Sequence, residues 1–121
     1  MKEIKIYHNP RCSKSREALK YLNDKGLNLD IILYTKNTLS KYEIKQLILK
    51  LKIPAIKLLR EKETIFEENK SLINLENEDS IIDLLVEYPS LIQRPIIEIN
   101  QEAVIGRPFE CIVDFLKSKM I

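Results

Sequence analysis

Hydrophobic positions in the first third of the chain follow a period of two, then a helical period, then a continuous run. Residues 2–7 alternate apolar and polar side chains, which predicts a short strand. From Ser13 to about Lys25 the apolar residues recur at helical spacing, and Gly26 supplies a stop. Residues 30–34 are almost continuously apolar, which predicts a second strand buried on both faces in a parallel pair. The chain is therefore expected to open with a βαβ unit.

The middle of the chain is helical in pattern. Ser40 is well placed as an N-cap, because Glu43 stands three residues later and completes a capping box. Pro54 ends that helix and is expected to open a second, shorter one. Residues 61–78 are irregular and polar and predict no definite element, whereas residues 81–86 predict another short helix.

The last third predicts a hairpin followed by a helix. Residues 96–99 and 103–105 form two short apolar runs around a turn at 100–102. Apolar residues between Phe109 and Leu116 then lie along one helical face. The order βαβ, helical insert, ββα predicts an α/β protein with a mixed four-stranded sheet flanked by helices, which is the order of a thioredoxin-like fold.

Composition narrows the class of protein. With 121 residues, 45% hydrophobic and 31% charged, the chain is expected to form a single globular domain over residues 1–121. A net charge of +2 and a pI of about 8.5 are too mild to predict nucleic-acid binding. No apolar run is long enough to cross a membrane, and residues 1–7 do not resemble a signal peptide, so we expect a cytoplasmic protein.

Cys12 is the strongest candidate for chemistry, because it stands between a predicted strand and a predicted helix. Backbone N–H groups and the dipole at a helix start stabilise an anion, which lowers the pKa of a thiol and also binds oxyanions. Arg11, Lys14 and Arg16 add positive charge around the same turn. Ser15 could donate a further hydrogen bond, and His8 could take up or relay protons near the sulfur. The alternatives are that Cys12 is a buried filler and His8 a structural residue.

The sequence gives little support for a dithiol site or for a metal site. Ser15 stands where a Cys-x-x-Cys pair would have its second thiol, so a disulfide on Cys12 needs an outside thiol or Cys111. We expect Cys111 to serve packing rather than redox chemistry. One histidine and two distant cysteines make no zinc site, and two glycines make no phosphate loop, so we expect no metal and no bound cofactor.

Three arginines stand out by position: Arg60, Arg94 and Arg107. Arg94 and Arg107 each precede a proline, and the two flank the predicted hairpin. A guanidinium is a planar, permanently charged fork that suits a tetrahedral oxyanion. The pattern alone does not distinguish an anion site from three surface arginines. Pro95, just before an apolar strand, is a candidate for a cis peptide bond.

Taken together, these segments resemble the glutathione- and glutaredoxin-coupled arsenate reductases, a family with a thioredoxin-like fold. The matching segments occur in order along nearly the whole chain: residues 8–16, 32–34, 58–60, 91–96 and 105–108. The resemblance implies that Cys12 attacks arsenate, that glutathione reduces the adduct to arsenite, and that glutaredoxin clears the mixed disulfide.

The resemblance also implies roles for individual residues. It makes Arg60, Arg94 and Arg107 the arginines that bind the oxyanion and its reduced product. It makes His8 a helper in holding Cys12 as thiolate, Ser15 a hydroxyl near it, and Pro95 the cis-proline that faces the cysteine. Two alternatives within the same fold stay open: a glutathione-dependent thiol reductase of unknown substrate, and a redox regulator that binds RNA polymerase. The regulators usually carry a Cys-x-x-Cys switch, which is missing here.

Overall fold

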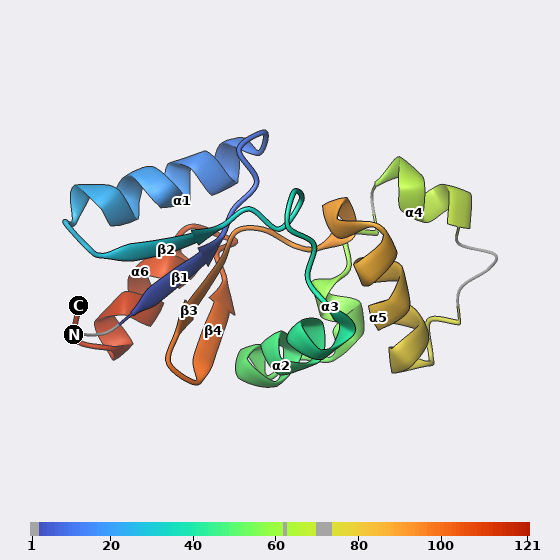
Figure 1. Ribbon diagram of the computed structural model, residues 1–121. Helices are drawn as coiled ribbons and strands as arrows, with labels where there is room; N and C mark the ends of the chain where they lie inside the picture. The colour runs from blue at the N-terminus through green and yellow to red at the C-terminus, as the bar shows by residue number, and fades with distance from the viewer. Residues whose placement is uncertain (1–2, 62, 70–73) are drawn as a thin grey trace. The chain divides into compact units, whose positions relative to one another are not determined.

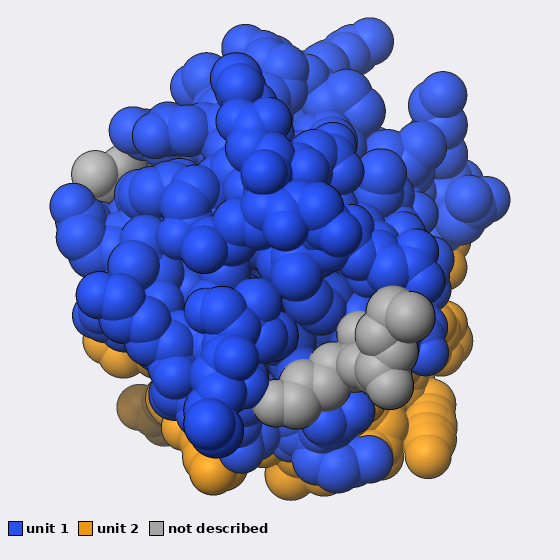
Figure 2. Space-filling view, turned by 90° about the vertical axis from the view of Figure 1, so that its left-hand side faces the viewer, with its two compact units in different colours: residues 1–37, 94–121 blue, residues 38–93 orange. Residues whose placement is uncertain are grey.

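The computed structural model describes residues 3–61, 63–69 and 74–121, and these form two compact units. One unit combines residues 1–37 with residues 94–121, and the other comprises residues 38–93 (Figure 2). That the chain makes one domain stays a prediction.

The first unit is built on a mixed four-stranded sheet in the order β2-β1-β3-β4 (Figure 1). Its strands are β1 (Ile4–Tyr7), β2 (Leu29–Ile32), β3 (Ile96–Ile99) and β4 (Glu102–Ile105). β1 runs parallel to β2 and antiparallel to β3, and β3 is antiparallel to β4. The predicted mixed four-stranded sheet is therefore confirmed.

Two helices, α1 (Ser13–Asp24) and α6 (Glu110–Ser118), pack on one face of this sheet. The alternation of β1 and β3 supplies the sheet side of the core, and the apolar stripes of the helices supply the other. The buried cluster consists of Ile4, Ile6, Ala18, Leu22, Ile97, Ile99, Ile112 and Leu116. This burial holds the ends of β1, β3 and β4 in register, and those ends carry the candidate site.

The prediction for the second strand was only partly right. β2 is parallel to β1, as expected, but it ends at Ile32 and is not buried on both faces. It lies at the edge of the sheet, so Asp30 is exposed and Ile31 is 45% exposed. The apolar run continues past the strand because Tyr34, two residues further on, is completely buried in a turn.

The hairpin between β3 and β4 forms without glycine. Asn100 adopts a φ of 56°, the left-handed conformation that asparagine tolerates better than most residues. Its place at the first turn position lets Ile96 pair with Ile105, and so brings the residues just outside the hairpin together.

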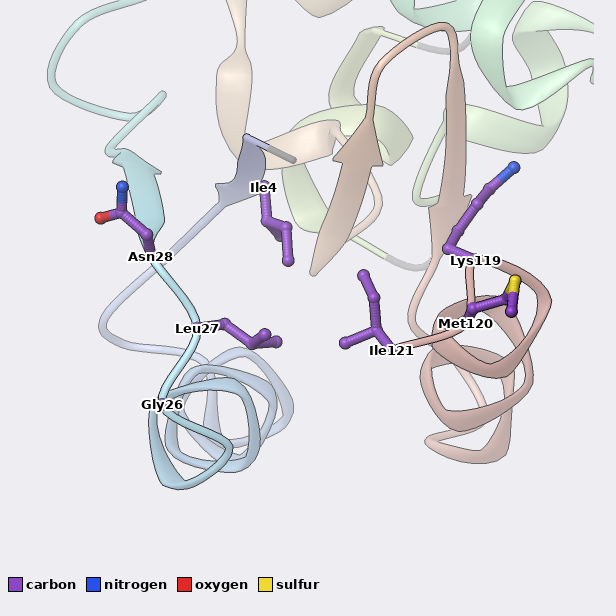
Figure 3. Close-up of a pocket in the computed structure, with 7 residues that line it drawn as sticks. All are labelled: Ile4, Gly26, Leu27, Asn28, Lys119, Met120 and Ile121. Atoms are coloured by element: carbon purple, nitrogen blue, oxygen red, sulfur yellow. The ribbon is translucent and has the colours of Figure 1, made fainter. Parts of the chain in front are cut away.

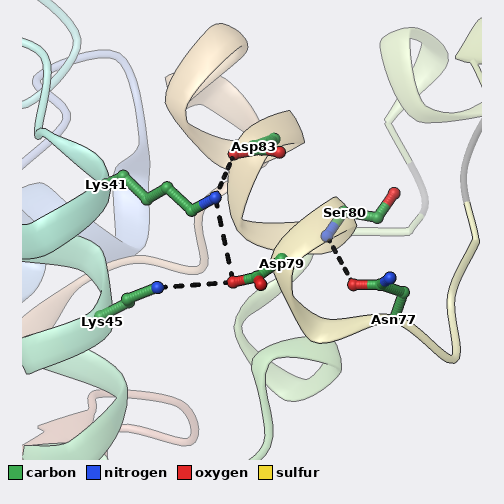
Figure 4. Close-up of polar contacts among 6 residues, drawn as sticks. All are labelled: Lys41, Lys45, Asn77, Asp79, Ser80 and Asp83. Carbon is green, nitrogen blue, oxygen red and sulfur yellow. Dashed lines mark hydrogen bonds and ion pairs between the residues drawn. The ribbon is translucent and has the colours of Figure 1, made fainter.

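The second unit is helical: α2 (Lys41–Leu51), α3 (Ala55–Leu58), α4 (Thr64–Asn69), α5 (Glu78–Glu87) and a 3₁₀ turn, η2 (Pro89–Leu91). α4 falls in the segment for which the pattern predicted no definite element. Between α2 and α5, Lys41 lies 3.0 Å from Asp83 and Lys45 lies 3.4 Å from Asp79 (Figure 4). These side chains are largely exposed, so solvent screens both pairs and they add little to the stability of the unit.

The capping box at the start of α2 gives a stability prediction. Glu43 N–H donates to Ser40 Oγ at 3.1 Å, and Ser40 N–H donates to Glu43 Oε1 at 3.0 Å. Ser40→Ala should lower the free energy of unfolding by about 1 kcal/mol, because a backbone donor loses its acceptor. Urea unfolding measures this. Because the two bonds form one motif, Ser40→Ala with Glu43→Ala should cost less than the sum of the single changes, and full additivity would contradict the box.

An open pocket of about 320 Å³ lies beside the start of β1 (Figure 3). Leu27 and Ile121 point into it from either side, and Ile4 lies at its base. Cys12 follows the opposite end of β1, so this pocket is separate from the candidate site.

Candidate functional site

Cys12 is the N-cap residue of α1, as the sequence predicted. A four-residue loop after β1 leads to it, and its N–H donates to Asn9 O at 3.0 Å. Its backbone is extended, with φ −94° and ψ 121°, and its carbonyl accepts the first helical bond, from Arg16 N–H at 3.0 Å. The Cys12 residue is 9% exposed, so it is largely shielded from solvent but still accessible to small reagents.

The environment of this sulfur favours the thiolate. Burial raises the pKa of the Cys12 thiol, but hydrogen bonds from Ser15 N–H, the Arg94 and Arg107 side chains and Lys14 N–H together bring it below its ordinary value. The two backbone donors are orphan N–H groups of the first turn of α1. The interpretation of Cys12 as an inert filler is therefore not supported, since a filler has no such donors.

Arg107 joins the ends of the hairpin to the cysteine. Its Nη2 lies 3.4 Å from Cys12 Sγ, and its Nε–H donates to Arg94 O at 2.8 Å. Both arginines reach this place because Ile96 pairs with Ile105, and each arginine lies two residues outside that pair. The structure therefore brings together three of the residues singled out from sequence.

The prolines and the glycine beside these arginines shape the same corner. The Arg94–Pro95 peptide is cis, as suggested for Pro95, and so is Arg107–Pro108, which was not anticipated. Gly106 N–H donates to Pro95 O at 2.8 Å. A Cβ at Gly106 would lie 2.8 Å from Ile112 Cδ1 and 3.0 Å from Pro95 Cγ, so a larger residue here would force the Ile112 side chain to shift.

His8 and Ser15 form a buried pair under the cysteine loop. His8 Nδ1 lies 2.6 Å from Ser15 Oγ, and that oxygen also accepts from Asn9 N–H at 3.0 Å. Burial, followed by the positive charge of Arg16, lowers the pKa of His8. We therefore assign a neutral imidazole whose Nδ1 accepts the serine proton. In this state His8 orders the loop and adds no charge to the thiolate.

Arg60 lies in the other unit, residues 38–93. Its N–H donates to Leu91 O at 2.7 Å, next to the bridge between Leu59 and Ile92. Its Nη2 lies 3.2 Å from a Glu63 carboxylate oxygen, while its buried Nη1 has no hydrogen-bond partner among the described residues. Its role in oxyanion binding stays a prediction.

Sequence reasoning assigned no role to two further residues of the site, Asn9 and Tyr34. Asn9 Oδ1 accepts from Arg11 N–H at 3.0 Å and so supports the loop. Tyr34 is 0% exposed, and burial raises the pKa of its phenol to about 12. Tyr34 belongs to one of the matching segments, but its apolar neighbours make it resemble a strand residue.

Comparison with known proteins now decides the family. A model of the ArsC family matches residues 7–115. The chain belongs to the ArsC family. An arsenate reductase of Neisseria meningitidis is 37% identical over 112 residues, covering 91% of this chain and 95% of that one. The uncharacterized protein YfgD of Escherichia coli is 36% identical over 116 residues, covering 95% and 98%.

Solved structures agree with this ArsC assignment. The arsenate reductase from Vibrio cholerae superposes with a TM-score of 0.87 at 34% identity, covering 93% of this chain and 97% of that one. A putative arsenate reductase from Yersinia pestis gives 0.84 at 34% identity, covering 92% and 98%. The predicted α/β, thioredoxin-like fold and the predicted family are thus both confirmed.

Two further observations concern the described residues of the chain. Across residues 3–61, 63–69 and 74–121, no three histidine, cysteine or carboxylate side chains come together as a metal site. Within the same ranges, no helix is long and apolar enough to span a membrane.

The environment of Cys12 predicts how the rate of its alkylation depends on pH. In a Cys111→Ser background, alkylation by iodoacetamide should reach half its maximal rate at a lower pH in the folded protein than in urea. By linkage, a depressed thiol pKa stabilises the fold above the unfolded-state pKa, and this stability is lost as pH falls through the folded-state pKa. Equal midpoints with and without urea would contradict an activated thiolate.

Proposed function

We propose that this protein reduces arsenate to arsenite, with Cys12 as nucleophile and with glutathione and glutaredoxin as electron donors. The observation that carries the proposal is a thiol of lowered pKa flanked by two arginines, in a chain of the ArsC family. Arsenate is a tetrahedral oxyanion, and the helix start together with the guanidinium forks supplies donors of matching charge. Reduced glutathione is a cytosolic reagent, which agrees with the expected cytoplasmic location.

The proposed reaction transfers two electrons from two thiols to arsenic. Cys12 thiolate attacks arsenate, an S–As bond forms, and one arsenate oxygen leaves as water after protonation. A glutathione thiol then displaces a second oxygen as water, and arsenic(V) takes two electrons as the two sulfurs join in a disulfide. Arsenite leaves, and glutaredoxin attacks the glutathione sulfur of the disulfide and restores the Cys12 thiol. A single thiol at the helix start suits this scheme, because the resolving thiol comes from outside.

Several side chains support this chemistry in the proposal. Arg94 and Arg107 hold the oxyanion and the thiolate together, and Arg60 is proposed as a third oxyanion-binding arginine on the basis of the resemblance alone. The neutral pair of His8 and Ser15 keeps the loop in the conformation that presents the sulfur.

A coupled assay tests the activity directly. Arsenate is added to the protein with glutathione, glutaredoxin, glutathione reductase and NADPH, and NADPH oxidation is followed. The proposal expects turnover that saturates with arsenate and that needs both glutathione and glutaredoxin. Absence of arsenate-dependent NADPH oxidation at any arsenate concentration would reject it.

A second candidate is a glutathione-dependent thiol reductase of unknown substrate. It is favoured by one structural observation: Cys12 is a lone, activated thiol whose neighbouring Ser15 is already engaged with His8. Such a thiol can exchange with a glutathione mixed disulfide without any oxyanion. Turnover of a mixed disulfide together with no arsenate turnover would favour this activity over arsenate reduction.

A further inference from the structure

Tyr34 is a buried phenol next to the reactive cysteine that the proposed mechanism does not use. It follows the end of β2, where Ile32 O accepts from His8 N–H at 2.9 Å. A turn in which Leu33 O accepts from Lys36 and Asn37 N–H, at 3.0 and 2.9 Å, sets the backbone after it. The side chain is thereby placed at the end of the sheet that carries the Cys12 loop.

The hydroxyl of Tyr34 needs an explanation. Its oxygen is completely buried, and it makes no hydrogen bond of ordinary length and angle with any described residue. A phenylalanine would fill the same space without desolvating a polar group, and buried hydroxyls in folded proteins are nearly always satisfied. The oxygen is therefore expected to act on a neighbour.

Three polar groups surround that oxygen within the first unit. The Arg94 guanidinium and the Asn9 side chain approach it closely enough to interact electrostatically, and the Cys12 sulfur lies near enough for its charge to be felt. Arg94 also interacts with the Cys12 sulfur, so the same guanidinium is shared by the thiolate and the phenol.

We propose that Tyr34 is a positioning residue whose buried hydroxyl oxygen holds the Arg94 guanidinium toward the Cys12 sulfur and the incoming oxyanion. This inference rests on the proposed function for its substrate, but not for its geometry. Arginine is long and flexible, and Arg107 is already anchored through its Nε–H on Arg94 O. The neutral oxygen of Tyr34 interacts electrostatically with the Arg94 guanidinium and so restrains the orientation of that side chain.

The chemistry of the anchor matters. A carboxylate behind a guanidinium pairs with its charge, as Glu63 does with Arg60. A phenol whose pKa is raised to about 12 stays neutral, so Tyr34 itself offsets none of the positive charge of Arg94. Tyrosine thus orients the arginine without neutralising it.

The test is Tyr34→Phe, which removes only the oxygen. Loss of the anchor should raise the pKa of the Cys12 thiol, measured from the pH dependence of iodoacetamide alkylation in the Cys111→Ser background. In the coupled assay it should raise the apparent KM for arsenate by about three- to tenfold, with a smaller effect on kcat. An unchanged alkylation midpoint would overturn the proposal.

A double-mutant cycle with Arg94→Ala shows whether Tyr34 acts through Arg94. In the Arg94→Ala background, Tyr34→Phe should produce no further shift of the alkylation midpoint. The same shift in both backgrounds would overturn the proposal that Tyr34 acts through Arg94. Alkylation needs no arsenate. If the protein fails the coupled assay, the proposed function is rejected, but the alkylation midpoints still test the role of Tyr34.

Tyr7→Phe is the matched control. Tyr7 is also a buried phenol of this sheet, but its hydroxyl donates to Glu98 Oε1 at 2.8 Å. Its removal should lower Tm and leave the alkylation midpoint of Cys12 unchanged, whereas Tyr34→Phe should shift the midpoint and leave Tm nearly unchanged. If both variants shifted the midpoint equally, a general loosening of the sheet would explain the result and the proposal would fail.

Discussion

Cys12→Ser is expected to lower arsenate turnover in the coupled assay by at least roughly a thousandfold. A serine hydroxyl has nearly the same shape, but it does not ionise at neutral pH beside donors that stabilise a thiolate. It also cannot form the disulfide through which arsenic receives its two electrons. The fold should be retained, because a hydroxyl can still accept from Arg107 Nη2 in place of the sulfur.

Cys111→Ser is the matched control for that loss. Cys111 lies in the first turn of α6, half-buried, and its Sγ donates to Arg107 O at 3.6 Å, a contact that serine can also make. Turnover should stay within about twofold of wild type if glutathione resolves Cys12. Substantial activity in Cys12→Ser would refute the nucleophile, and loss of turnover in Cys111→Ser would make Cys111 the resolving thiol.

Arg107→Lys carries the second largest expected effect, a fall in kcat/KM for arsenate of about a hundredfold. Lysine keeps the positive charge, so a purely electrostatic role would leave activity nearly intact. The guanidinium, however, donates from Nε to Arg94 O at 2.8 Å while Nη2 faces Cys12 Sγ at 3.4 Å. A single ammonium cannot reach both partners, so the Arg94 carbonyl oxygen and the Cys12 thiolate lose the donor that they share. Kinetics and the alkylation midpoint measure the two losses separately.

Arg11→Lys is the control for charge and composition in the same region. Arg11 is exposed in the loop before Cys12, and it is its backbone N–H that bonds to Asn9. This variant should keep kcat/KM within about twofold of wild type. Equal losses in Arg11→Lys and Arg107→Lys would mean that the site senses overall charge rather than the fork of Arg107.

Local patterns predicted most of the elements correctly. The capping box at Ser40 formed as expected because all its partners lie within four residues of chain. The stop at Gly26, with φ 71°, is equally local. The prediction for β2 was partly wrong because an apolar run does not show whether a strand is central or at the edge. That depends on the strands beside it. α4 was missed because its six residues carry too few turns for a clear periodicity.

The position of Cys12 at a helix start, and of Arg94 and Arg107 on either side of a hairpin, could be predicted from the sequence alone. Both follow from neighbours in the chain, because caps and turns depend on short-range hydrogen bonds. The convergence of Arg94 and Arg107 on Cys12 emerged only from the three-dimensional fold, since it requires β1 to pair with β3, about ninety residues away. The fold also sets the pKa of His8, which burial and Arg16 lower, and the pKa of Tyr34, which burial raises to about 12, because burial and charges distant in sequence determine both.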